Sequence, residues 1–230
     1  MNRSRFLLLS AFLVAGAAVC SAADAPAKKR LLILGDSISI GYTPIVQKML
    51  ADEMTVLRPM RGERPENCSG TTSGVANIDR WLQIDGGKWD VIHFNWGLHD
   101  LKHVKPGDPK GATSELATDP PQATVDVYEK NLREIVAKLK ATGAKLIFAT
   151  TTPVPEGAMK VYRNNADAIR YNEAALRVMK DNGITVNDLY AFAKPQLAEI
   201  QLQPANVHFT PKGSEALASE VVKAARAAVK

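Results

Sequence analysis

The 230-residue chain carries 29 Lys and Arg against 24 Asp and Glu, a formal net charge of +5. This imbalance is too small to indicate a nucleic-acid partner, because proteins that bind nucleic acids concentrate much more positive charge on one face. The length is suited to one domain with a sizeable hydrophobic core.

Residues 1–23 have the layout of a secretory signal peptide. Two arginines precede an apolar run, and small residues follow it, so we expect cleavage after Ala22 or Ala23. A lipoprotein would use Cys20 instead, but Val19 is bulkier than such a site favours. The sequence therefore predicts a secreted or periplasmic protein.

The mature chain, residues 24–230, is expected to form a single domain. Removing two arginines and no acid lowers the formal charge from +5 to +3. Only Cys68 remains, so no internal disulfide is possible and the core must stabilise the fold. No later apolar stretch is long enough for a membrane span. The sequence leaves the oligomeric state open.

Strands and helices alternate along the mature chain. Buried strands are predicted at 31–34, 54–57, 89–96, 145–150 and 184–188. Helices are predicted over 44–51, from Thr71 to Leu82, and over 124–142, 166–181 and 211–229. This alternation predicts an α/β protein, a three-layer α/β/α sandwich around a five-stranded parallel sheet. Sites in such sheets lie beyond the carboxyl ends of the strands.

The first strand stops at Gly35-Asp36-Ser37, which indicates a tight turn into a helix. Gly35 allows the sharp turn, and Asp36 suits the positive end of the following helix. Ser37 falls where backbone N–H groups are still unpaired, a place that can stabilise an oxyanion. Ser37 is therefore a candidate nucleophile.

Three further polar clusters are expected at the same edge of the sheet. They are Ser69-Gly70-Thr71-Thr72, Gly97-Leu98-His99-Asp100 and Asn206-Val207-His208-Phe209-Thr210. The irregular segment 101–123, rich in Pro and Gly, leaves the same edge and could wall a pocket.

In this order, the four blocks resemble those of the SGNH, or GDSL, hydrolase superfamily over essentially the whole mature chain. The resemblance implies the flavodoxin-like SGNH fold, with Ser37 as nucleophile and His208 as general base. It places the N–H groups of Ser37 and Gly70 in the oxyanion hole. The motif differs from the Gly-x-Ser-x-Gly nucleophile elbow of α/β-hydrolases, because Ser39 occupies the position of the second glycine.

The third block departs from the superfamily pattern at His99, where an Asn normally donates to the oxyanion. A neutral imidazole still has one N–H and could replace the amide. A similar Trp-Gly-Leu-His-Asp sequence occurs in a subgroup of exported bacterial esterases. His99 is therefore expected to complete the oxyanion hole, with a purely structural loop histidine as the alternative.

The last block departs at Ala205, which stands where the superfamily has the Asp that orients the base. Three substitutes are open: a main-chain carbonyl, the Asn206 amide oxygen, and Asp188 at the end of the fifth strand. The alternative role of Asp188 is helix capping.

The other reactive residue types are given structural roles. His93 alternates with apolar residues in a strand and is expected in the core. His99 and His103 have the spacing of a helical zinc motif but follow a strand and precede Pro106, which disfavours a long helix. Cys68 is expected to be a spectator thiol. No metal or cofactor is predicted.

The sequence as a whole predicts a secreted serine esterase that hydrolyses small acyl esters, above all acetyl esters on carbohydrate, through an acyl-enzyme. The substrate class follows from the resemblance to exported carbohydrate acetylesterases. Tyr42 and Trp96 could stack on sugar rings or simply pack in the core. The alternatives are an acyltransferase to a sugar and a non-catalytic carbohydrate-binding relative.

Overall fold

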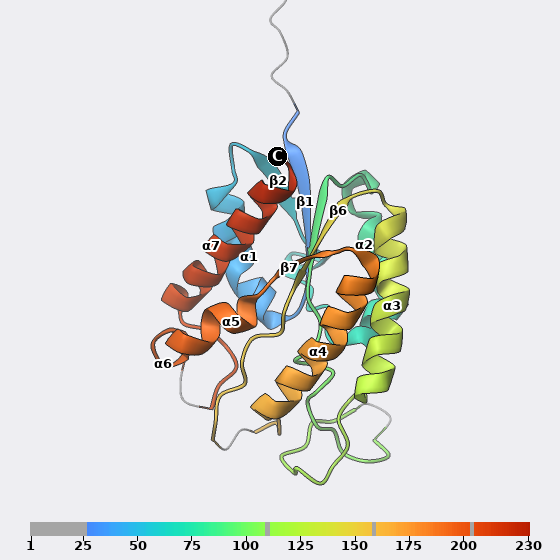
Figure 1. The fold of residues 1–230 in the computed structure, drawn as a ribbon, viewed down its shortest axis with the longest axis vertical. Helices are drawn as coiled ribbons and strands as arrows, with labels where there is room; N and C mark the ends of the chain where they lie inside the picture. Colours follow the sequence, from blue (N-terminus) through green and yellow to red (C-terminus); the bar gives the residue numbers. More distant parts are fainter. Residues whose placement is uncertain (1–26, 109–110, 158–159, 203–204) are drawn as a thin grey trace, which may run out of the picture.

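A computed structural model describes residues 27–108, 111–157, 160–202 and 205–230 (Figure 1). The predicted signal peptide, 1–23, lies outside the described residues. In the part that is described, no helix is both long enough and apolar enough to cross a membrane.

The centre of the fold is a parallel five-stranded sheet with the order β2-β1-β5-β6-β7. Its strands are β1 (Lys29–Leu34), β2 (Met54–Leu57), β5 (Val91–Phe94), β6 (Lys145–Ala149) and β7 (Thr185–Asn187). β1 pairs with β2 on one side and with β5 on the other, where Leu34 lies opposite Phe94. Because both faces of the sheet are covered, Leu31–Leu34 are completely buried.

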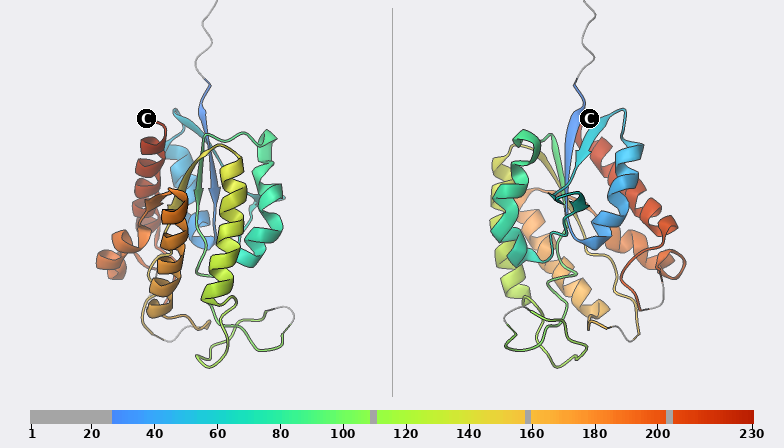
Figure 2. Two further views of the ribbon diagram at one scale, coloured as in Figure 1. Left: turned by 45° about the vertical axis from the view of Figure 1, so that its right-hand side comes forward. Right: turned by 180° about the vertical axis from the view of Figure 1, so that it is seen from behind.

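Helices cover both faces of the sheet, as the α/β/α prediction requires (Figures 1 and 2). One face carries α1 (Ser37–Met49) and α7 (Pro211–Ala228), and the other carries α2 (Thr71–Leu82), α3 (Val125–Ala141) and α4 (Asn165–Asn182). Short helices η1 (Ile84–Gly86), α5 (Leu189–Ala193), η2 (Lys194–Gln196) and α6 (Leu197–Ile200) complete the described helices. The predicted fold class is therefore confirmed.

The prediction that the first helix begins at Pro44 is wrong, because α1 begins at Ser37. The Asp36 side chain accepts a hydrogen bond from the Ile38 N–H at 2.9 Å and so caps the helix there. Pro44 lies inside the helix. The earlier start places Ser37 at the first helical residue, directly at the end of β1.

The polar segment 61–70 is partly buried. It contains most of the hairpin of β3 (Met60–Arg61) and β4 (Arg64–Pro65). Glu66 and Cys68 then turn inward and are 7% and 0% exposed. The Cys68 N–H donates to the main-chain O of Gly35 at 3.2 Å, a tertiary contact that local composition does not show.

The carboxyl ends of the strands lie at the lower edge of the molecule in Figure 1. The long connection from β5 to α3 is also found there and is largely irregular, with isolated bridges such as His103 with Pro121. The segment that precedes α7 reaches the same edge from the other side. The topology therefore gathers the four predicted polar blocks at one edge.

Candidate active site

Ser37 and His208 lie in direct contact at this edge. His208 Nε2 is 3.0 Å from Ser37 Oγ. Ser37 is held by the start of α1, and His208 lies in the segment that leads into α7. The main-chain O of His208 accepts from the Leu202 N–H at 3.0 Å, and Thr210 caps α7. The imidazole is therefore presented by a segment that is fixed at both ends.

The second ring nitrogen of His208 contacts Asn206. Asn206 Oδ1 lies 2.9 Å from His208 Nδ1 and also accepts from the His208 backbone N–H at 3.0 Å. Because a backbone N–H can only donate, the Asn206 atom at this position is the oxygen. The ring then carries its proton on Nδ1, and Nε2 is free to accept from the Ser37 hydroxyl.

Neither of the other two substitutes, a main-chain carbonyl or Asp188, hydrogen-bonds to this imidazole among the described residues, where its ring contacts are Asn206 and Ser37. Ala205, at the superfamily Asp position, has a left-handed backbone with φ of 60°. Asp188 instead accepts from Thr150 Oγ1 at 2.8 Å and from the Ala191 N–H at 3.0 Å, so it caps α5. Of the three substitutes left open, the amide of Asn206 therefore occupies the orienting position.

The predicted oxyanion donors lie on two adjacent loops. Neither the Ser37 N–H nor the Gly70 N–H donates to any described residue. The Cys68 N–H donates to the main-chain O of Gly35 at 3.2 Å. This hydrogen bond joins residues 66–70, called the Gly70 loop below, to the turn before Ser37. A side chain on Gly70 would meet Asp100 Oδ1 and Gln122 Nε2 at 3.0 Å each. Glycine therefore suits this close approach, and Gln122 brings the 101–123 segment up to the site.

Asp100 holds the start of α2 and with it Gly70. Its Oδ1 accepts from the Thr71 N–H at 2.7 Å and from Thr71 Oγ1 at 2.6 Å. Its Oδ2 is buried without a hydrogen-bond partner among the described residues. Burial, which disfavours the ionised form, raises the pKa of Asp100 to about 7. The sequence contains Asp100 in the Gly97-Leu98-His99-Asp100 block, but it does not show that Asp100 positions the start of α2.

His99 is half-buried and makes no hydrogen bond to a described residue. Burial is the main cause that lowers its pKa to about 3, and the charges of Lys102, Arg163 and His208 contribute to that lowering. The imidazole is therefore neutral at ordinary pH and keeps one N–H to donate. The interaction with His208 places both histidines at the same edge of the sheet.

Buried Arg58, which the sequence reasoning did not single out, joins the two loops that carry Ser37 and Gly70. Its guanidinium donates to Ser39 Oγ at 3.2 Å and to Thr43 Oγ1 at 2.9 Å. It also donates to the main-chain oxygens of Gly35 at 3.4 Å and Glu66 at 3.0 Å. One side chain thus hydrogen-bonds to polar groups on both sides of the site. This role of Arg58 depends on tertiary contacts, which no local sequence pattern shows.

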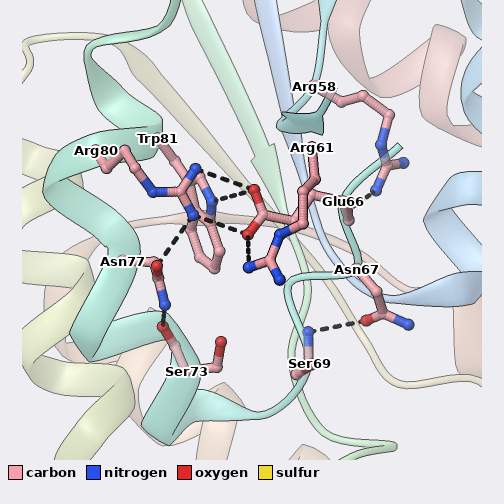
Figure 3. A network of polar contacts seen from close by, with 9 residues as sticks. All are labelled: Arg58, Arg61, Glu66, Asn67, Ser69, Ser73, Asn77, Arg80 and Trp81. Carbon is pink, nitrogen blue, oxygen red and sulfur yellow. Dashed lines mark hydrogen bonds and ion pairs between the residues drawn. The ribbon is translucent and has the colours of Figure 1, made fainter. Parts of the chain in front are cut away.

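The Gly70 loop is braced on its other side by a network around Glu66 (Figure 3). The Glu66 carboxylate accepts from both terminal nitrogens of Arg80, at 3.0 and 2.8 Å, and from Trp81 Nε1 at 3.2 Å. These hydrogen bonds lower the pKa of Glu66. The Asn67 side chain then accepts from the Ser69 N–H at 2.9 Å. The loop is therefore preorganised from end to end.

Cys68 and His93, both given structural roles from the sequence, are buried. Burial raises the pKa of the Cys68 thiol to about 12, so it remains protonated. His93 is fully buried with Asn187 Nδ2 at 3.3 Å from its Nε2, and burial lowers its pKa to about 4. Tyr42 and Trp96 are 1% and 0% exposed. Of the two roles considered for these aromatics, packing is correct and stacking on a sugar is wrong.

Within the described ranges, no three His, Cys, Asp or Glu side chains are gathered where they could hold a metal ion. His103 makes structural contacts instead. Its ring packs against that of Tyr162 at a tilt of 60° with centroids 4.6 Å apart, and its Nδ1 lies 3.1 Å from the Leu116 carbonyl oxygen.

A serine hydroxyl bonded to an oriented imidazole, at the carboxyl edge of a parallel sheet, is the arrangement of a serine hydrolase. The chain belongs to the GDSL-like lipase/acylhydrolase family, whose profile matches residues 33–216. Membership makes it a carboxylic ester hydrolase. No curated protein matches the chain in sequence.

Solved structures share the fold at low sequence identity. An acetyl xylan esterase called AlAXEase is 16% identical with a TM-score of 0.63, and the match covers 85% of this chain and 98% of that one. An acetylxylan esterase from Geobacillus stearothermophilus is 16% identical with a TM-score of 0.65, covering 85% and 93%. A lipase/acylhydrolase from Enterococcus faecalis is 20% identical with a TM-score of 0.63, covering 86% and 96%.

The substitution Asp100→Asn is expected to remove a pH dependence of stability. The folded-state pKa of about 7 exceeds the unfolded value of 3.8, so protonation favours the folded state. This contribution is complete below pH 3.8 and is lost as the pH rises through about 7. Asn keeps an oxygen for Thr71 but does not titrate. Wild type should therefore lose free energy of unfolding relative to the variant over this range.

Urea unfolding of both proteins across that pH range measures the effect. Asp52→Asn is the matched control, because Asp52 is exposed. A stability difference between wild type and Asp100→Asn that is constant with pH would contradict the prediction.

Proposed function

We propose that this protein is an exported serine esterase that removes small acyl groups, above all acetyl, from carbohydrate. The observation that carries the proposal is the 3.0 Å contact between Ser37 Oγ and His208 Nε2. Family membership supplies the ester-hydrolase chemistry. The proposed export rests on the signal-peptide pattern of residues 1–23.

In the proposed reaction, His208 Nε2 takes the Ser37 hydroxyl proton as Oγ attacks the ester carbonyl carbon. The imidazolium then gives this proton to the leaving alcohol as the ester C–O bond breaks, which leaves an acyl-enzyme. Water attacks the acyl-enzyme with His208 again as the base, and Ser37 is regenerated. Asn206 keeps the Nδ1–H tautomer throughout, because its oxygen accepts from that nitrogen.

The developing oxyanion is assigned to three donors: the N–H groups of Ser37 and Gly70 and the imidazole of His99. The two backbone donors have no other described acceptor, so they are available to the substrate. Ser37 stands at the first residue of α1, where the helix dipole also favours negative charge. Donors that are already in place stabilise the transition state without reorganisation.

A carbohydrate substrate is supported by the resemblance and by two structural neighbours that are named as acetyl xylan esterases. The irregular segment 101–123 also argues against a lipase. It is rich in polar and charged residues and does not offer an apolar lid.

Hydrolysis of 4-nitrophenyl acetate and acetate release from acetylated xylo-oligosaccharides test the function. Wild type should release acetate from both, and Ser37→Ala should lower kcat by a factor of about 10³ or more, since the covalent route is lost. Ser219→Ala, on the exposed face of α7, is the matched control. No hydrolysis by wild type would indicate the binding-only alternative, and equal rates for wild type and Ser37→Ala would also overturn the proposal.

The substitution His99→Ala should lower kcat about a hundredfold, because loss of one oxyanion donor costs about 3 kcal/mol. His99→Asn restores a side-chain N–H donor of the kind that the superfamily uses, so it should recover part of the rate. The measurement is kcat for 4-nitrophenyl acetate. An alanine variant with unchanged kcat would remove His99 from the mechanism.

The substitution Asn206→Ala should lower kcat by a factor of about 10 to 100, since a general base contributes about 10²–10⁴ and here loses its orientation. Asn206→Asp should retain activity but shift the acidic limb of the pH profile of kcat/KM upward. The reason is that a carboxylate beside Nδ1 favours the imidazolium. A profile that is unchanged in Asn206→Asp would show that Asn206 does not act through His208.

A further inference from the structure

Arg163 places a half-buried positive charge at the rim of the candidate site. It lies in the segment before α4, and its Nε donates to the main-chain O of Leu98 at 2.8 Å. Leu98 directly precedes His99, so Arg163 is attached to the loop that carries the proposed side-chain oxyanion donor. The remaining guanidinium N–H groups donate to no described residue.

Lys102 adds a second cation beside it. Lys102 is also half-buried, and its ammonium forms no ion pair or hydrogen bond with a described residue. Burial lowers the pKa of Lys102, and the nearby Arg163 charge lowers it further. This mutual effect indicates that the two cations lie near each other.

The carboxylates that face this pair do not neutralise it by contact. Burial lowers the pKa of Arg163 and of Lys102, and the charges of Asp36 and Asp100, respectively, oppose that lowering, so both acids lie within electrostatic range. Neither acid forms an ion pair with Arg163 or Lys102 among the described contacts: Asp36 Oδ1 caps α1, Asp100 Oδ1 holds Thr71, and Asp100 Oδ2 is buried without a described partner. Asp100 is also partly protonated near neutral pH, since its pKa is raised to about 7.

Both cations are partly withdrawn from water, and among the described residues their charged groups make one hydrogen bond, from Arg163 Nε to the Leu98 carbonyl oxygen. Part of the desolvation cost is therefore not offset by a described contact. Other charges near the site are better satisfied. Arg58 donates to four oxygens, and Glu66 accepts from Arg80 and Trp81. An anion bound between Arg163 and Lys102 would supply that missing compensation.

We propose that Arg163 and Lys102 form an anion subsite that binds a carboxylate carried by the ester substrate, beside the acyl group that Ser37 attacks. The substrate class is then an acetylated acidic sugar, a uronic acid unit, rather than a neutral one. The free terminal nitrogens of a guanidinium match the two oxygens of a carboxylate, and the ammonium adds a point charge. This inference rests on the proposed esterase function and adds specificity to it.

The test compares two esters that differ only in charge: acetylated methyl glucuronoside with a free carboxylate, and the same compound as its uronate methyl ester. Wild type should show kcat/KM for acetate release at least about tenfold higher for the acid, because one charge-assisted hydrogen bond contributes about that factor. Raised ionic strength should reduce this ratio.

Arg163→Gln should bring the ratio of the two kcat/KM values close to one, and Lys102→Gln should reduce it. Arg163→Lys keeps the positive charge but lacks the paired N–H donors of the guanidinium, so the ratio of the two kcat/KM values should be intermediate. These substitutions can also displace Leu98 and His99 and so lower the activity on both esters. Such a general loss cancels in the ratio of the two kcat/KM values. Lys105→Gln, an exposed lysine in the same insertion, is the matched control and should keep the wild-type ratio.

Equal kcat/KM for the two esters in wild type, or a ratio unchanged in both Arg163→Gln and Lys102→Gln, would overturn the anion subsite. In either case hydrolysis of 4-nitrophenyl acetate would leave the esterase proposal standing. If wild type hydrolysed none of the three esters, the esterase proposal itself would fail, and the subsite with it.

Discussion

The contact between Ser37 Oγ and His208 Nε2, 3.0 Å long, joins residues that are 171 positions apart in the sequence. It depends on the parallel sheet, which places β1 between β2 and the central strand β5 and so sets the start of α1 inside the carboxyl edge of the sheet. The helix α7 packs beside α1 on the same face, and the segment that enters α7 carries the imidazole to that edge. Every other feature of the site is arranged around this meeting point.

Buried polar side chains hold the loops around the pair. Arg58 binds the β1–α1 turn to the Gly70 loop, and Asp100 binds the start of α2 to the end of β5. Such groups are expensive to bury unless they are hydrogen-bonded, so their presence favours one arrangement of the loops over others. The N–H groups of Ser37 and Gly70 are free because both residues stand at the start of a helix, and the bracing holds those two starts in place.

The two departures from the superfamily pattern fit one another. An amide at Asn206 orients His208 without placing a negative charge beside it. His99, which burial keeps neutral, stands where the family uses another neutral donor. Among the described residues, the acids that oppose the positive charges of Arg163 and Lys102 are Asp36 and the partly protonated Asp100. This local balance is what gives the proposed anion subsite its physical basis.

The sequence by itself determined the fold class and the four blocks at the edge. Apolar runs such as Leu31–Leu34 have few alternatives to a buried strand, and short polar motifs after such runs fall at the edge that the topology shares. It could not determine the start of α1, because that depends on how Asp36 caps a helix that also contains Pro44. The choice of Asn206 over Asp188, the inward turn of Glu66, the bracing by Arg58 and the isolation of Arg163 were decided only by the tertiary structure. Each depends on distances between segments that are remote in sequence, and no local pattern of residues encodes such distances.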